Sequence, residues 1–332
     1  MNESFPIDAI KPGNMPRIGV LINPNSGGNK NGLTAIRRTI AQYPRMSHCD
    51  VRKPPEVLAA LEDFARRGVE LVIVNGGDGT VQAVLTALFH NRPFETMPLL
   101  AVLQSGTTSM TARDVGFSGS PVKALDKIFR WAETAVGDPR IVQRPVLQVQ
   151  APGHDTRYGM FFGTAGIYQG IEYFHRNVNS RRLRGELGPG LTIARFLWSA
   201  SFRRSDFISA VPISITVDNQ PTQELDCMVL LISTLERLFL GLYPYWGDEK
   251  APLHFTALRK RPRRLMQCLP YILWGRKNQR IRPENGYHSH NASKIKLSLD
   301  SGFTLDGQLY MPENSLEPTE VQSGAVAAFL QI

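Results

Sequence analysis

A glycine-dense turn between a strand-like and a helix-like segment constrains the fold of this chain more than any other feature. The largely β-branched run 69–75 predicts a buried strand, and the next five residues, Gly76 to Thr80, read Gly-Gly-Asp-Gly-Thr. The apolar residues that then recur at helical spacing are Val81, Val84, Leu85 and Leu88. Glycines can adopt positive φ and let a ligand approach the backbone, and Thr80 is placed to cap the helix, whose N-terminus attracts anions. The pattern favours a phosphate-binding turn; an ordinary strand-to-helix connection is the alternative.

Two more polar turns follow predicted strands. The strand 17–23 ends in Asn23 and continues Pro-Asn-Ser-Gly-Gly to Gly28, and the strand 99–103 is followed by Ser-Gly-Thr-Thr over 105–108. From residue 17 to about 118 strands alternate with helices, which predicts a parallel, doubly wound sheet. Because such sheets bind ligands beyond the carboxyl ends of their strands, we expect the three turns to converge on one crevice.

The chain beyond about residue 139 predicts a different architecture. Short, often alternating apolar runs favour a mostly antiparallel β domain, either a sandwich or a distorted barrel. These runs cover residues 141–150, 158–163, 211–217, 227–233, 253–258, 294–299 and 325–330. Helical inserts are expected near 190–202 and 262–276. We therefore predict an α/β + β chain, with a doubly wound α/β domain at 17–138 and a β-rich domain with helical inserts at 139–332.

Charge and cysteine content narrow the function classes. Thirty-eight Lys and Arg against 29 Asp and Glu give a net charge of +9, which suits nucleic acid, an anionic membrane or phosphorylated ligands. The densest basic stretch runs over 259–282, but no zinc finger, RNP-like run or basic zipper accompanies it, so we expect no nucleic-acid partner. Three widely spaced cysteines, no secretory signal and no apolar run of about 18 residues predict a cytoplasmic protein.

The three turns together resemble a known family. The sequence Gly-Gly-Asp-Gly-Thr at Gly76 is similar to the signature of the superfamily that contains diacylglycerol, sphingosine, ceramide and NAD kinases and phosphofructokinases. The Asn-Pro-x-Ser-Gly opening at Asn23 and the Gly-Thr loop at Gly106 resemble the diacylglycerol kinase catalytic domain over about residues 17–118. The resemblance implies an ATP- and Mg²⁺-dependent kinase that phosphorylates a lipid hydroxyl. A diacylglycerol-like acceptor is the default, and a sphingoid or ceramide acceptor stays open.

The resemblance also implies which residues form the site. Those expected to hold the nucleotide are Asn23, Pro24, Ser26, Gly27, Gly76, Gly77, Asp78, Gly79, Thr80, Gly106, Thr107 and Thr108. Asp78 is expected to act as the base for the acceptor hydroxyl and to contact the metal, and Asp306 is the second candidate base. The family's chain further implies that the last strand returns to the first domain.

The chain departs from the family pattern at three places. Met110 stands where the family has an Asp, and a thioether does not ligate a hard cation, so Asp114 is the expected substitute. Gln308 replaces the closing Glu, and an amide cannot accept a proton as a base. The family's later Asp-Gly region reads Trp-Gly-Asp-Glu-Lys here, which makes Asp248 a further candidate metal ligand.

Two segments, 191–204 and 259–282, pair apolar helical stripes with basic residues. Tryptophan beside cations suits a bilayer interface, so we expect peripheral contact with the anionic inner face of the membrane; packing against the β domain is the alternative. His288 and His290 have no third ligand nearby in sequence and are interpreted as loop residues. A homodimer is left open.

Two other functions stay open at this point. One is an NAD kinase-like enzyme, which the Asn-Pro-x-Ser-Gly opening and the Asp-Gly-Gln close disfavour. The other is a lipid- or nucleotide-binding protein without catalysis, which the two replaced family acids at Met110 and Gln308 motivate.

Overall fold

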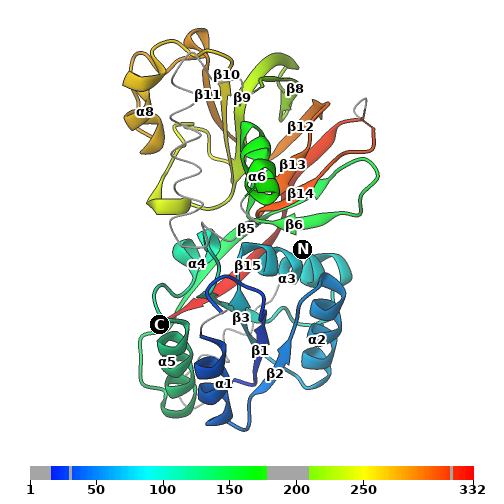
Figure 1. Cartoon of the computed structure of the whole chain (residues 1–332), viewed down its shortest axis with the longest axis vertical. Helices are drawn as coiled ribbons and strands as arrows, with labels where there is room; N and C mark the ends of the chain where they lie inside the picture. Colours follow the sequence, from blue (N-terminus) through cyan, green and yellow to red (C-terminus); the bar gives the residue numbers. More distant parts are fainter. Residues whose placement is uncertain (1–15, 30–31, 178–208, 315–316) are drawn as a thin grey trace. The chain divides into compact units, whose positions relative to one another are not determined.

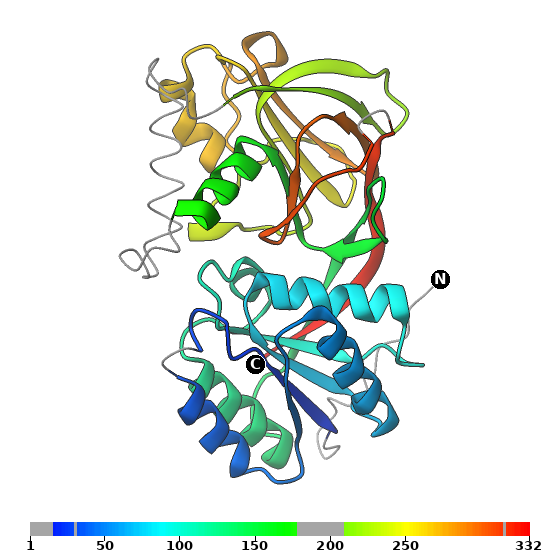
Figure 2. The same ribbon diagram turned by 45° about the vertical axis from the view of Figure 1, so that its right-hand side comes forward.

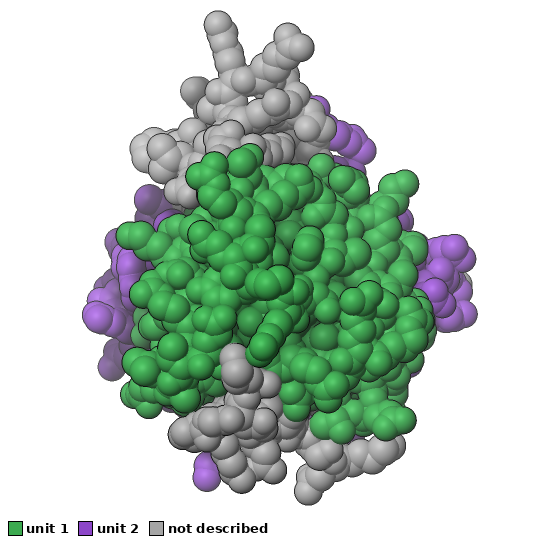
Figure 3. Space-filling view, turned by 90° about the horizontal axis from the view of Figure 1, so that it is seen from below, with its two compact units in different colours: residues 1–144, 237–239, 325–332 green, residues 145–236, 240–324 purple. Residues whose placement is uncertain are grey.

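The computed structural model describes residues 16–29, 32–177, 209–314 and 317–332 (Figure 1). The described chain divides into two compact units, coloured separately in Figure 3. Unit 1 comprises residues 1–144, 237–239 and 325–332, and unit 2 comprises residues 145–236 and 240–324. Two long strands, β5 (Arg140–Gln150) and β15 (Thr319–Gln331), each contribute residues to both units.

Unit 1 is built on a parallel sheet. Its strands are β1 (Ile18–Ile22), β2 (Ser47–Asp50), β3 (Leu71–Gly76), β4 (Leu99–Gln104) and the end of β15. They lie in the order β2-β1-β3-β4-β15, and each neighbouring pair is parallel; β15 joins β4 where Phe329 lies opposite Leu100. The strand order changes direction between β1 and β3. The carboxyl ends of these two strands therefore form the topological switch point at which doubly wound sheets bind ligands.

Helices cover both faces of this sheet. On one face α1 (Leu33–Ala41) and α5 (Pro121–Thr134) lie side by side, and their buried side chains pack on the alternate strand residues Val20, Ile73 and Ala101 (Figure 1). On the other face are α2 (Pro54–Arg66) and α3 (Asp78–Thr86). The ring of Phe64 on α2 fits against Gly19 so closely that a Cβ on this glycine would lie 2.6 Å from it. A parallel sheet covered on both faces explains why the inner strands β1, β3 and β4 are apolar for most of their length.

Shorter helical segments complete unit 1. The chain continues from α3 into a π-helical turn, η2 (Ala87–Asn91), and α4 (Met110–Val115) follows β4. The 3₁₀ turn η3 (Phe239–Gly241) begins among the residues that return to this unit.

Unit 2 is an antiparallel β structure with its own core. Its strands are β6 (Arg157–Gly159), β7 (Phe161–Ala165), β8 (Val211–Val217), β9 (Gln223–Ser233), β10 (Leu253–Arg259), β11 (Tyr287–Ala292), β12 (Lys294–Leu299), β13 (Phe303–Leu305) and β14 (Gln308–Tyr310). The long strand β9 pairs with β7, β8 and β10, and β10 pairs with β11, all antiparallel. The inward residues of these strands, such as Phe162, Leu230 and Phe255, form one buried cluster.

Two helices and a 3₁₀ turn accompany these strands: α6 (Gly166–Asn177), α8 (Leu265–Leu273) and η4 (Pro283–Asn285) (Figures 1 and 2). Helix α8 buries Cys268 and Ile272 in a second, smaller cluster with Met228, Leu258 and Tyr287. None of the described helices is long and apolar enough to cross a bilayer.

The predicted fold class, a parallel N-terminal sheet followed by an antiparallel C-terminal region, is confirmed, while several element bounds differ from prediction. The run 158–163 is split at Met160 into β6 and β7, because the backbone N–H of Met160 bonds a side chain rather than a strand. The helix expected over 262–276 is only α8, since Pro262 and Gly275 lie outside it. The helix expected near 190–202 lies outside the described residues.

Candidate functional site

Three glycine-containing turns of unit 1 meet at the carboxyl ends of β1, β3 and β4. The backbone N–H of Asn23, directly after β1, donates to the carbonyl of Asn75 on β3 at 2.9 Å. The N–H of Gly28 and the hydroxyl of Ser26 both donate to the carbonyl of Ser105 after β4, at 2.9 and 2.5 Å. The predicted convergence of the turns is thus present within unit 1, at the switch point of its sheet.

A buried network of amide and hydroxyl groups holds the turns together. Asn29 is fully buried, and its side-chain N–H donates to the carbonyls of Asn23 and Asn75, at 2.8 and 3.2 Å. The Ser105 hydroxyl donates to the side-chain oxygen of Asn75. Sequence reasoning placed Ser105 in the third turn but did not single out Asn29 or Asn75. The available signal for Asn75 was a polar residue at the end of an apolar strand.

Asp78 links the central turn to the helix after the third turn. Its carboxylate is buried, with 6% of the residue exposed, and accepts three hydrogen bonds. Oδ2 accepts from the Thr108 hydroxyl at 2.8 Å and from the Met110 N–H at 3.1 Å, and Oδ1 accepts from the Thr111 N–H at 3.1 Å. A carboxylate offers roughly four lone-pair positions, so these bonds leave one, on Oδ1. The carboxylate therefore holds the N-terminus of α4 while keeping one position for a further partner.

The glycines of the second and third turns allow close packing of the chain, and they do not adopt the positive φ expected for the second turn. Gly76, Gly77 and Gly106 all have negative or extended backbone conformations. A Cβ on Gly76 would lie 2.5 Å from the Thr80 side chain, and one on Gly106 would lie 2.6 Å from Cα of Gly77. The backbones of the β3–α3 and β4–α4 turns are therefore in direct contact, which only glycine allows.

Thr80 does not cap helix α3, contrary to expectation. The helix already begins at Asp78, with Gly77 as N-cap, so Thr80 is in its first turn. The Thr80 hydroxyl instead accepts a hydrogen bond from the Asn23 side chain at 2.8 Å and connects the first turn to the second. The first N–H groups of α3, those of Asp78 and Gly79, have no intrahelical acceptor and so can bind an anion.

The remaining predicted nucleotide-binding residues lie around this junction. Gly27 and Thr107 are exposed, while Pro24 and Thr108 are half-buried. A Cβ on Gly27 would lie 2.8 Å from the Thr107 hydroxyl, so the first and third turns also touch. Free N–H groups, hydroxyls and bare backbone are the groups that cradle phosphate, so the described residues fit a nucleotide phosphate.

The predicted metal ligands do not form a cluster. Asp114 lies on α4, but its Oδ2 accepts from the Arg144 guanidinium at 3.1 Å and its Oδ1 from the Arg237 N–H at 3.2 Å. Asp248 belongs to unit 2, where it is exposed and paired with Lys277. Within the described ranges no group of three or more His, Cys, Asp or Glu could hold a metal ion. Mg²⁺ usually needs only one or two carboxylates beside the phosphates of its nucleotide, and Asp78 is the one predicted ligand whose hydrogen bonds place it between the second and third turns.

Asp306 forms a tight hairpin turn in unit 2. Asp306 and Gly307 connect β13 to β14 with φ of 49° and 85°, the left-handed pair that a two-residue type I′ turn requires. The buried carboxylate accepts from the N–H groups of Met160 and Phe161, at 2.9 and 3.0 Å. Gln308 follows on the surface. The acid that resembles the family's closing motif is therefore engaged in joining this hairpin to the start of β7.

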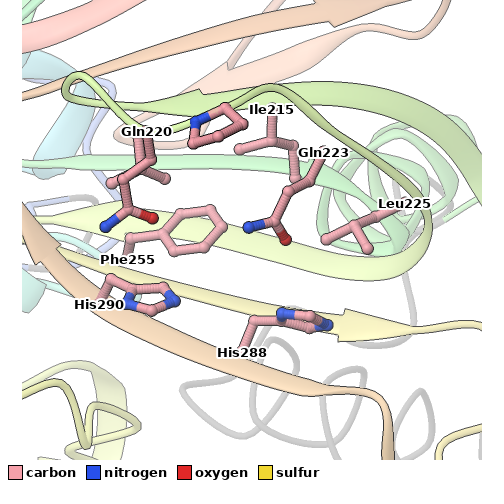
Figure 4. A pocket seen from close by; sticks show the side chains of 9 residues that line it. Ile215, Gln220, Gln223, Leu225, Phe255, His288 and His290 are labelled. Atoms are coloured by element: carbon pink, nitrogen blue, oxygen red, sulfur yellow. The ribbon is translucent and has the colours of Figure 1, made fainter. Parts of the chain in front are cut away.

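A small pocket in unit 2 is separate from these groups (Figure 4). Its walls are formed by Ile215, Val217, Gln220, Pro221, Gln223, Leu225, Phe255, His288 and His290. The carboxamides of Gln220 and Gln223 point toward the side on which the two histidines lie (Figure 4). The pocket has room for roughly one water molecule, so it is too small for a nucleotide or a lipid headgroup.

The two histidines of this pocket are strand residues, which corrects their interpretation as loop residues. Both lie on β11, with their side chains on the same face, and Nδ1 of His290 is 2.8 Å from Oε1 of Glu249. His288 is only 7% exposed, and its Nε2 has no partner among the described residues. Burial, followed by the nearby His290 and Arg259, lowers the pKa of His288, while Glu284 opposes the shift.

A doubly wound sheet with three hydrogen-bonded glycine turns at its switch point gives unit 1 the architecture of α/β domains that bind ligands at the carboxyl ends of their strands. Residues 17–137 match the diacylglycerol kinase catalytic domain. This match covers the residues whose motifs resemble the same family.

Relatives of known sequence agree with this assignment. The protein named diacylglycerol kinase of Bacillus subtilis is 32% identical over 119 residues, which are 34% of this chain and 38% of that protein. A relative from Caenorhabditis elegans is 32% identical over 125 residues, 36% of this chain and 13% of its own length. The matched segment thus spans less than half of either relative.

The fold resemblance extends over almost the whole chain. The crystal structure of a diacylglycerol kinase from Bacillus anthracis superimposes with a TM-score of 0.60, covering 95% of this chain and 96% of that one. The sequences are 18% identical, so this likeness concerns the fold.

Replacing Gly106 by Ala will destabilise unit 1. The added Cβ would lie 2.6 Å from a backbone atom of Gly77, so the two turns must separate, at a cost of about 1–3 kcal/mol of unfolding free energy. Urea unfolding measures this loss. Gly32→Ala is the matched control, because its Cβ meets its nearest neighbour at an ordinary 3.6 Å. Equal midpoints for the two variants would contradict the close approach of the turns.

Acidification will destabilise unit 2 through His288. Its pKa in the folded chain is lower than the unfolded value of about 6.5. Below that pH the unfolded state therefore binds more protons than the folded state does. Stability is unaffected well above pH 6.5 and falls as the pH drops below it. Urea unfolding across this pH range will show that the free energy of unfolding falls less steeply with acidification in His288→Gln than in the wild type. The control His48→Gln, at an exposed position, will follow the wild type. Parallel pH profiles for wild type and His288→Gln would exclude this effect.

Proposed function

We propose that this chain is an ATP-dependent kinase that transfers the γ-phosphoryl group to a lipid hydroxyl, with a diacylglycerol-like acceptor as the first choice. The observation that carries the proposal is the meeting of three glycine turns at the switch point of unit 1, within a segment of the diacylglycerol kinase catalytic family. Phosphoryl transfer needs positioning and charge neutralisation more than covalent chemistry. Backbone N–H groups at the start of α3 and the hydroxyls of the third turn supply groups of this kind.

Membership in a kinase family implies ATP and a divalent cation, most simply Mg²⁺. The cation would supply charge neutralisation of the phosphates when bound. In the proposed site the nucleotide phosphates rest on the turns at Asn23–Gly28, Gly76–Thr80 and Gly106–Thr108.

Asp78 is the proposed base for the acceptor hydroxyl. Three hydrogen bonds fix the orientation of its carboxylate and leave one lone-pair position on Oδ1. An acid held in this way can accept a proton without reorientation, which is the geometric requirement for general base catalysis. Asp306 is the second candidate, but its two oxygens already bind backbone N–H groups of unit 2.

A second candidate function is nucleotide or lipid binding without catalysis. Two observations near the third turn favour it. Asp114, the expected substitute metal ligand, is paired with Arg144, and Met110 stands where the family has an acid. An assay of radiolabelled phosphate transfer from ATP with Mg²⁺ separates the possibilities. Phosphorylated diacylglycerol, ceramide or sphingosine supports the first proposal, NADP supports an NAD kinase-like enzyme, and ATP binding without any product supports the binding protein.

Asp78→Asn will reduce turnover by at least about 10²-fold while nucleotide affinity changes only a few-fold, because an amide cannot take the proton. The comparison variant is Thr108→Val, which removes one hydrogen bond to the carboxylate and keeps the base. Single-turnover phosphoryl transfer and calorimetric ATP binding measure the two effects. If both variants lose turnover in proportion to their loss of stability, Asp78 has only a structural part and the assignment fails.

A further inference from the structure

A surface around helix α8 carries much of the exposed apolar area of unit 2. Among the described residues the large hydrophobic side chains that are well exposed are Val136, Tyr173, Leu240, Tyr243, Met266, Tyr271, Trp274 and Met311. Three of them, Met266, Tyr271 and Trp274, lie on α8 or directly after it, and Trp274 is 56% exposed. Tyr243 lies beside them, because its N–H donates to the carbonyl of Leu273 at 2.9 Å. We call these four residues the α8 patch.

Helix α8 is unusual for a surface helix. It packs inward through the buried Cys268 and Ile272 and the partly buried Leu265. Its outer side is apolar too, since Gln267 is the only amide and the helix has no charged side chain. A surface helix ordinarily presents a polar face to water. At nine residues it is also far too short to span a bilayer.

Cations surround this apolar helix on both sides. Residues 259–282 contain nine Lys and Arg and no Asp or Glu, so the segment carries as much net positive charge as the whole chain. The cations are Arg259, Lys260, Arg261, Arg263, Arg264, Arg276, Lys277, Arg280 and Arg282. All nine are exposed, and in the described part of the chain only Lys277 has an ion-pair partner, Asp248.

We propose that the α8 patch and its flanking cations dock the chain on an anionic lipid bilayer. Apolar and aromatic side chains enter the headgroup boundary while neighbouring cations bind anionic headgroups, and the two contributions add. A polyanion such as nucleic acid would meet the charge but leave Met266 and Trp274 in water. The inference rests on the proposed function for its choice of a lipid surface, where the acceptor hydroxyl would be found.

Co-sedimentation of the full chain tests the charge contribution. The vesicles are phosphatidylcholine alone and phosphatidylcholine mixed with phosphatidylglycerol. The variant Arg263→Gln with Arg276→Gln removes one cation on each side of α8, and Arg38→Gln with Arg45→Gln removes the same charge from exposed positions of unit 1. We expect the wild type to bind the mixed vesicles, the α8 variant to bind at least about tenfold more weakly, and the control to differ by less than about twofold.

Fluorescence tests the insertion of the patch. Mixed vesicles with bromine-labelled acyl chains will quench tryptophan emission of a bound Trp198→Phe variant, which lacks the tryptophan of the other segment expected at the bilayer, and adding Trp274→Phe will remove most of this quenching while binding persists. The other described tryptophans are buried or half-buried, at Trp131 and Trp246. Equal binding by the two charge variants, unchanged quenching on adding Trp274→Phe, or no binding to the mixed vesicles would each overturn the inference. The last result would leave an acidic protein as the partner of the patch.

A short-chain, water-soluble diacylglycerol separates this inference from the proposed function. The α8 variants should keep turnover on this acceptor, because it does not require docking. Asp78→Asn should lose turnover on it and still bind the mixed vesicles as the wild type does. Failure of turnover in the wild type on every lipid acceptor, with vesicle binding intact, would count against the kinase and not against the docking surface.

Discussion

The hydrogen bonds accepted by one buried carboxylate organise unit 1 around its switch point. Asp78 begins α3, yet its oxygens bind the first N–H groups of α4 and the hydroxyl before it. A helix as short as α4 would not form stably alone, because its first turn fixes several residues for a single bond. The carboxylate supplies that missing partner, and its charge strengthens each bond. The position of the third turn, and with it the shape of the site, therefore depends on an acid in the second.

Much of this arrangement could be predicted from the sequence. The alternation of apolar runs and helical stripes gave the parallel sheet, and the position of each glycine turn directly after a strand gave the common edge at which they meet. The resemblance to the diacylglycerol kinase catalytic domain, expected from the same motifs over about residues 17–118, is confirmed by a match over residues 17–137. These predictions succeeded because they depend on local periodicity and on the general topology of doubly wound sheets.

The incorrect predictions concern residues whose roles are determined by tertiary contacts. The glycines at 76 and 77 were expected to provide positive φ, but Gly76 makes room for the Thr80 side chain, and Gly77 lets the backbone at Gly106 approach closely. Asp306-Gly307 resembled a catalytic motif and is also the strongest local signal for a type I′ hairpin, which the chain uses. His288 and His290 were interpreted as loop residues, and their strand, β11, gives little sequence signal, because it has four consecutive polar residues and lacks the β-branched residues that mark most strands. No local pattern could show Asn29 to be fully buried, since its burial depends on carbonyls that lie far away in sequence.

The last strand has a consequence for how the protein is made. β15 begins in the antiparallel structure of unit 2 and ends in the sheet of unit 1, beside β4. During translation, residues 16–144 emerge long before residues 325–332. The parallel sheet of unit 1 therefore lacks β15 beside β4 until unit 2 has been synthesised. Exposed strand edges promote association with other chains, and the nascent protein is therefore vulnerable to aggregation over this interval.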